Sequence, residues 1–140
     1  MVIALGVTIS ASAAGPTVTT PDGRPLEWSG WIDDNAPVAV LLWASWVPGA
    51  DTTLTDLGGI RTAVRDRGLD LVVVVLQEPI EEAKESLEGV DITWFHDRYG
   101  HLLKDYRVVS IPRILVIDEE GRVVERLDAT TASVRSRGGE

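Results

Sequence analysis

The sequence predicts an α/β domain built on a mixed central sheet, and three observations indicate it. Residues 38–43 form a continuous apolar run and residues 69–76 contain four consecutive valines, and both patterns are typical of strands buried on both faces. Residues 51–67, which separate them, carry apolar side chains at helical spacing. A strand, a helix and a second strand in this order form a parallel crossover. Residues 114–127 have the pattern of an antiparallel hairpin, so the sheet is mixed.

A short β-hairpin is expected ahead of this core. Residues 17–20 and 25–28 flank the tripeptide Pro21-Asp22-Gly23. Proline presets its own φ angle and glycine accepts a positive φ angle, so the tripeptide favours a tight turn. The hairpin is therefore predicted as an amino-terminal extension of the domain.

Gly58 and Gly59 lie inside the predicted helix of residues 51–67. Each glycine costs a helix about 1 kcal/mol relative to alanine, so a kink or break is expected there. Pro79 opens a shorter helix, because the missing N–H of proline costs nothing in a first turn. The remaining predicted elements are an extended segment at residues 92–95 and a helical turn at residues 102–106. The two hairpin strands are predicted at residues 114–117 and 122–127.

Composition and charge exclude several classes of function. The 140 residues correspond to one domain, and 44% of them are apolar, which is enough for a sizeable core. The net charge is −9 without any cluster of lysine and arginine, which argues against nucleic acid and anionic membranes as partners. No apolar run is long enough to span a bilayer. The chain has no cysteine, which excludes disulfides, thiolate nucleophiles and cysteine-bound metals.

We expect neither a cofactor nor a metal site. The chain has no glycine-rich phosphate loop and no Gly-x-Ser-x-Gly nucleophile motif. His96 and His101 have Asp97 and Asp105 nearby, but a spacing of five residues does not place two side chains on one helical face.

Both ends of the chain are expected to lie outside the domain, which we place at residues 15–128. Residues 1–14 contain a short apolar run and the Ala11-Ser12-Ala13 pattern of a signal-peptidase site, without a positively charged start. A signal-like segment and an extra strand both remain open interpretations of them. Residues 129–140 are polar with little apolar periodicity, which predicts a frayed tail.

Residues 42–50 read Leu-Trp-Ala-Ser-Trp-Val-Pro-Gly-Ala. This stretch resembles the Phe-Trp-Ala-Ser/Thr-Trp-Cys-x-x-Cys motif of thioredoxin-like thiol–disulfide oxidoreductases, in particular the extracytoplasmic branch of cytochrome c maturation with its redoxin or AhpC/TSA-like domain. The resemblance continues in the same order to residue 127. It implies a thioredoxin-like fold with flanking helices. Its further segments are residues 72–80, 95–100, 106–112 and 117–121.

The resemblance breaks at the two positions on which the chemistry of the family depends. Val47 and Ala50 stand where the family has cysteines. The first cysteine is ionised at the start of a helix, and the second resolves the mixed disulfide. Valine and alanine can neither ionise nor attack sulfur. Thiol exchange is therefore excluded for this chain, and no catalytic residue is expected.

The same resemblance implies a groove for an extended peptide. Pro112 matches a proline that is cis in the family and lies beside a backbone edge that pairs with substrate. A second interpretation is that Pro112 only shapes the loop before a strand. The expected groove residues are Trp46, Val47, Pro48, Gly49, Ala50, Ile111, Pro112 and Arg113, the last in place of a small hydroxyl residue.

Glu78 matches a buried glutamate with which the family tunes the pKa of its cysteine. Lone carboxylates are mostly exposed, so we expect a solvated loop acid at this position, with a buried acid as the alternative. The final helix of the family, which covers one face of the sheet, is not recognisable after Leu127. Because such a large apolar face is unfavourable when exposed to solvent, we expect it to be covered, either by residues 1–14 or by a second copy of the chain in a homodimer.

Three functions remain open. We favour a redox-inactive module that binds a protein or an extended peptide in the groove. The alternatives are a thiol–disulfide oxidoreductase whose cysteines at positions 47 and 50 have been lost or mutated, and a structural domain that acts through dimerisation. The resemblance favours an extracytoplasmic location.

Overall fold

A computed structural model describes residues 15–138, so both interpretations of residues 1–14 fall outside the described residues. The elements follow one another as the sequence analysis expects, with two additional helices. In chain order they are β1 (Thr17–Thr19), β2 (Pro25–Glu27), α2 (Trp28–Asn35), β3 (Val38–Trp43), α3 (Ala50–Thr55), α4 (Leu57–Asp66), β4 (Asp70–Leu76), α5 (Ile80–Ser86), β5 (Thr93–Asp97), α6 (His101–Asp105), β6 (Arg113–Ile117), β7 (Val123–Asp128) and α7 (Thr131–Gly138).

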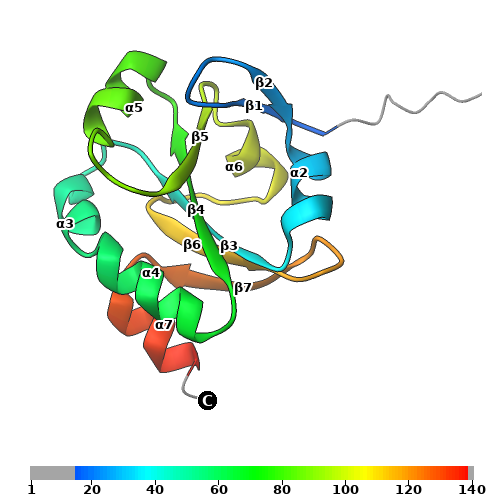
Figure 1. Cartoon of the computed structure of the whole chain (residues 1–140), viewed down its shortest axis with the longest axis vertical. Coiled ribbons are helices and arrows are strands. Elements are labelled where there is room, and N and C mark those ends of the chain that lie inside the picture. Colours follow the sequence, from blue (N-terminus) through cyan, green and yellow to red (C-terminus); the bar gives the residue numbers. More distant parts are fainter. Residues whose placement is uncertain (1–14, 139–140) are drawn as a thin grey trace, which may run out of the picture.

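Within the described residues the strands form one mixed sheet of seven, in the order β2-β1-β5-β4-β3-β6-β7 (Figure 1). Strands β3, β4 and β5 are parallel, and β6 runs antiparallel to β3. The hairpin of β1 and β2 adds to the outer edge of β5. The predicted α/β class, the mixed sheet and the amino-terminal hairpin extension are thus confirmed.

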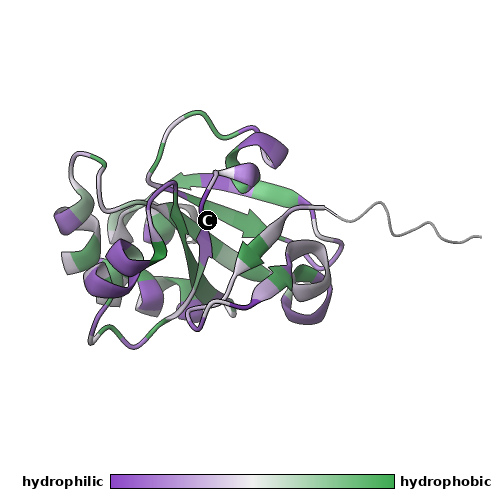
Figure 2. Ribbon diagram, turned by 90° about the horizontal axis from the view of Figure 1, so that it is seen from above, coloured by the Kyte–Doolittle hydropathy of each residue, from purple (hydrophilic) through white to green (hydrophobic). Residues whose placement is uncertain are grey.

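Helices cover both faces of the sheet, which accounts for the continuous apolar runs. All six residues of β3 are buried, because alternate side chains enter two separate cores. Helices α3, α4, α5 and α7 pack on one face, where Leu41 and Val73 point. Helices α2 and α6 pack on the other, where Val40 and Val74 point. Hydrophobic strands accordingly lie between helices with hydrophilic outer stretches (Figure 2). No helix within residues 15–138 is long and apolar enough to cross a bilayer.

Helix α2 begins at Trp28, which the sequence analysis assigned to the end of the second hairpin strand. Trp28 and Ile32, one helical turn apart, are both buried. The Trp28 indole stacks on that of Trp31 with ring centroids 5.3 Å apart, and its Nε1 donates to the hydroxyl of Tyr106 at 2.8 Å. Burial raises the pKa of the Tyr106 hydroxyl above its ordinary value. The contact with Tyr106 joins segments 78 residues apart, so no local pattern reveals it.

The break in the predicted helix of residues 51–67 falls at Asp56, two residues before Gly58. Both glycines lie inside α4. Gly58 has open space where a Cβ would lie, whereas a Cβ on Gly59 would collide with the hydroxyl oxygen of Thr131. Gly59 therefore permits α7 to approach α4 rather than kinking the helix.

Helix α7 contradicts the prediction of a frayed tail for residues 131–138. Its first residue, Thr131, donates its backbone N–H and its hydroxyl to the Asp56 carboxylate, at 2.8 Å and 2.7 Å. Val134 is fully buried against α4. The final helix is short but present, and it lies beside α4 (Figure 1). Helix α7 therefore packs on the sheet face whose expected exposure suggested a homodimer.

Candidate functional site

The loops that the sequence analysis singled out meet at one edge of the sheet. Residues 44–49 follow β3 and residues 77–79 follow β4. Residues 107–112 precede β6, which runs antiparallel to β3. The carboxyl ends of the parallel strands and the amino end of β6 therefore share this edge. In open α/β sheets this edge is where ligands usually bind.

A groove of about 320 Å³ lies between these loops. Two apolar side chains stand exposed on it, Trp46 at 54% and Val109 at 99%. Exposed apolar residues of this size that gather at a concave site are characteristic of contact surfaces. The groove is lined by Trp46, Val47, Pro48, Gln77, Leu103, Val108, Val109, Ser110 and Ile111.

Val47 and Ala50, which occupy the cysteine positions, are buried apolar side chains at the base of this loop. They are 7% and 5% exposed and belong to the core beneath α3. Ala50 is the first residue of α3, after Gly49 with a φ angle of 83°. Its carbonyl oxygen accepts the indole N–H of Trp43 at 3.3 Å. Only Val47 of the two lines the groove, and neither can exchange a proton or an electron pair.

The segment before β6 lines the groove with residues 108–111. The Ile111–Pro112 peptide bond is cis, as the resemblance implies for this proline. Within the part of the chain that the structure describes, the N–H groups of Val109, Ser110 and Ile111 donate no hydrogen bond. Backbone groups in this condition pair readily with an added extended chain.

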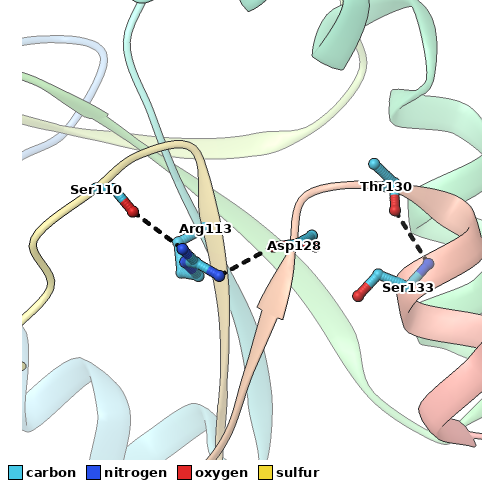
Figure 3. A network of polar contacts seen from close by, with 5 residues as sticks. All are labelled: Ser110, Arg113, Asp128, Thr130 and Ser133. Atoms are coloured by element: carbon cyan, nitrogen blue, oxygen red, sulfur yellow. Dashed lines mark hydrogen bonds and ion pairs between the residues drawn. The ribbon is translucent and has the colours of Figure 1, made fainter.

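Arg113 does not line the groove, contrary to expectation. Its guanidinium lies 3.0 Å from the Asp128 carboxylate and donates to the Ser110 hydroxyl at 2.9 Å (Figure 3). These contacts hold the side chain across β6 and β7. Gly49, Ala50 and Pro112 are likewise absent from the lining, whereas Trp46, Val47, Pro48 and Ile111 belong to it.

Glu78 is buried at 2% exposure, which corrects the expectation of a solvated loop acid. Its Oε1 accepts the backbone N–H of Ser45 at 2.7 Å and the Ser45 hydroxyl at 2.9 Å. The carboxylate finds its hydrogen-bond donors within the fold, so burial does not leave it unsatisfied. The Trp46 indole N–H also donates to the Leu76 carbonyl, at 3.2 Å. The loop that carries Trp46 is thus fixed to the end of β4 at two points.

The two histidines have separate environments. His96 is buried, with its Nε2 at 2.5 Å from the carbonyl oxygen of Glu78. Asp97 accepts the backbone N–H groups of His101 and Leu102, at 3.0 Å and 2.8 Å, and so caps α6. Across residues 15–138 no three side chains of the metal-binding types come together.

Sequence reasoning missed part of the groove and the partner of Glu78. Gln77, Leu103, Val108, Val109 and Ser110 line the groove without a motif that marks them. Gln77 has a φ angle of 60°, and its side chain packs against Gly100, where a Cβ would lie 2.9 Å from Nε2. Ser45, which holds Glu78, lies inside the quoted motif. The Ser45 hydroxyl, which can donate a hydrogen bond, was the feature of the sequence that could have indicated a partner for the Glu78 carboxylate.

Comparisons with known proteins agree with this architecture. The curated relative ResA, a thiol–disulfide oxidoreductase of Bacillus thuringiensis subsp. konkukian, is 20% identical over 123 residues, which cover 85% of this chain and 69% of the relative. A secreted disulfide oxidoreductase of Mycobacterium tuberculosis, homologous to E. coli DsbE, superimposes with a TM-score of 0.67 at 13% identity, over 93% of this chain and 98% of that one. The exposed lipoprotein thioredoxin Etrx1 of Streptococcus pneumoniae gives 0.60 at 22% identity, over 90% and 98%.

The structural neighbours establish the thioredoxin-like fold, which agrees with the strand order and the loop arrangement around the groove. The profile of the Redoxin family matches residues 10–131, from ahead of β1 to the start of α7. With the fold, the site and most of the chain in agreement, this protein belongs to the redoxin family, although it has no cysteine.

Proposed function

We propose that this redoxin domain binds an extended segment of another polypeptide in the groove beside Trp46 and does not catalyse thiol–disulfide exchange. The observation that carries the proposal is an apolar groove of about 320 Å³ next to backbone N–H groups, at residues 109–111, that pair with no other described residue. Side-chain pockets and a free backbone edge together are what extended peptides use for binding.

The charge and rigidity of the site support this function. Among the residues that the structure describes, no ionised side chain lines the groove, so an apolar segment that binds there removes no charged group from water. The hydrogen bonds from Ser45 to Glu78 and from Trp46 to Leu76 hold the loop in place before any ligand arrives. A preformed site requires less ordering on binding.

A location outside the cytoplasm is part of the same proposal. The structural neighbours include a secreted disulfide oxidoreductase and an exposed lipoprotein. A cysteine-free domain is chemically compatible with an oxidising compartment, because it has no thiol to oxidise.

The test is selection of random peptides displayed on phage against the wild-type domain. Enriched peptides are then measured on Val109→Asp and Trp46→Ala. We expect both substitutions to weaken binding at least tenfold, since each removes an exposed apolar contact of about 1.4 kcal/mol or more. Val124→Asp is the matched control, because Val124 is 56% exposed on β7, outside the groove. Failure to enrich any peptide, or equal loss in Val124→Asp, contradicts the proposal.

A further inference from the structure

A second pocket lies at the opposite end of the sheet from the groove. It has a volume of about 320 Å³, within the range of sites for small molecules. Its floor is formed at the amino ends of β3, β4 and β5, by Val38, Val72 and Thr93 among others. Helix α2 contributes Trp31 and Asn35 to one wall, and helix α4 contributes Arg61 and Arg65 to another.

The pocket holds an excess of positive charge although the chain is strongly acidic. Arg61 and Arg65 lie four residues apart on α4, so their side chains are neighbours on one face of the helix. Arg61 donates to the carbonyl oxygen of Asp91 at 2.5 Å, which leaves its charge uncompensated. In the part of the chain that the structure describes, neither arginine takes part in an ion pair. Among the described residues that line the pocket, Asp70 is the acidic one, so two positive side chains face one negative side chain.

The wall contributed by α2 is a fixed aromatic surface. The Trp31 ring stacks on Trp28 with centroids 5.3 Å apart and planes 20° apart. The Phe95 ring lies nearly perpendicular to the Trp31 ring, with centroids 5.2 Å apart and planes at 79°. Trp31 is only half-buried by these contacts and by the rest of the fold, so part of its ring lines the pocket. An indole held in place on one side offers its remaining surface to a ligand without losing rotamer freedom.

We propose that this pocket binds a small organic anion in which an aromatic ring carries a carboxylate. The guanidinium groups of Arg61 and Arg65 receive the carboxylate, and the ring contacts Trp31. Arginine suits this function because its planar array of N–H donors matches the two oxygens of a carboxylate. An inorganic anion makes no use of the indole, and a neutral ring makes no use of the arginines. The pocket is separate from the peptide groove, so the inference does not depend on the proposed function.

The experiment is an NMR titration of the whole chain with benzoate as the probe. We expect saturable shifts of the Trp31 indole N–H and the Thr93 amide, with a Kd of about 1 mM, as befits a ligand of this size. The indole N–H of Trp46, in the groove, is expected not to move. Arg65→Gln should weaken binding at least tenfold. Because the Arg65 side chain is exposed and forms no hydrogen bond with any other described residue, this substitution leaves the fold intact.

The matched control is Arg126→Gln, which removes the same charge from an exposed position on β7, away from the pocket. An unchanged Kd in this variant supports a local contact, whereas a loss equal to that of Arg65→Gln overturns the proposal. Benzamide and inorganic phosphate test the two halves of the ligand, and each is expected to bind at least tenfold more weakly than benzoate. Binding of either as tightly as benzoate, or no saturable shift at Trp31, also overturns it.

Discussion

Glu78 is a buried carboxylate whose hydrogen-bond donors are the backbone and the hydroxyl of Ser45. In the family that the chain resembles, a glutamate at this place tunes a cysteine, but here positions 47 and 50 are valine and alanine. In this protein the carboxylate bonds to the loop after β3 instead. It orders the loop that presents Trp46, next to a second contact from the Trp46 indole to Leu76.

Substitution of Glu78 tests this role. We expect Glu78→Ala to lower the free energy of unfolding by about 2 kcal/mol, since it leaves the Ser45 N–H without its acceptor in a partly buried site. Glu78→Gln keeps an oxygen acceptor at the same place and should cost less than half as much. Urea denaturation of the three proteins provides the comparison. Equal losses in both variants would show that the charge, and not the acceptor, is what matters.

At the scale of elements, the two consecutive glycines of α4 have different roles. Gly58 faces open space, and Gly59 lies against Thr131 of α7. Because α7 carries few apolar residues, its position depends on this close approach and on the Asp56 carboxylate that accepts the first N–H of the helix. Helix α7 is therefore held by tertiary contacts rather than by its own propensity.

Alanine at each glycine should have opposite effects. Gly58→Ala is expected to stabilise the domain by about 0.5–1 kcal/mol, because alanine favours an exposed helix interior. Gly59→Ala is expected to destabilise it, because the new Cβ displaces Thr131. Thermal unfolding followed by circular dichroism measures both. A gain in both variants would mean that α7 does not pack against α4 in solution.

The contact between Asp56 and Thr131 should also make α7 sensitive to acid. The backbone N–H of Thr131, and then its hydroxyl, lower the pKa of the Asp56 carboxyl below its ordinary value. The stabilisation is therefore complete above the ordinary pKa of aspartate and is lost as the pH falls through the lowered value. Asp56→Asn should reduce the free energy of unfolding by about 1 kcal/mol at neutral pH.

The difference in free energy of unfolding between the wild type and Asp56→Asn should be smaller at about pH 3 than at neutral pH, because protonation of Asp56 removes the same stabilisation from the wild type. Urea titrations of both proteins at the two pH values decide this. A constant difference between them at both pH values would contradict the assignment. Asp66→Asn is the control, since Asp66 is exposed and pairs with Arg135 only at 3.5 Å.

At the scale of the whole molecule, the protein is a redoxin domain without any cysteine for thiol exchange. The sheet order brings the loops after β3 and β4 to the segment before β6, and these loops form a groove that needs no thiol. At the other end of the same sheet, α2 and α4 line a second pocket, in which two arginines accompany apolar side chains.

Placing cysteines at positions 47 and 50 tests whether the fold still supports thiol–disulfide exchange. We expect the double variant Val47→Cys, Ala50→Cys to gain insulin reduction with dithiothreitol as electron donor, because position 47 lines the groove and position 50 begins α3. The wild type and the variant with Ala50→Cys alone serve as controls. No gain in the double variant would show that loss of the two cysteines alone does not explain the loss of chemistry.

The sequence by itself determined the class of fold, the parallel crossover and the chemistry that is missing. Continuous apolar runs at β3 and β4, turn residues between strands and the absence of cysteine are local or compositional properties, so they can be read without coordinates. The motif around Trp46 and Pro112 also identified four of the groove residues, Trp46, Val47, Pro48 and Ile111.

Only the tertiary structure decided the burial of Glu78, the direction of Arg113 and the existence of α2 and α7. Each depends on a partner far away in the sequence. Ser45 lies 33 residues from Glu78, and Thr131 lies 75 residues from Asp56. A buried polar group is stable only where such a partner meets it, and a short helix with a weak apolar pattern is stable only where another element docks it. Neither condition is visible in a local pattern of residues.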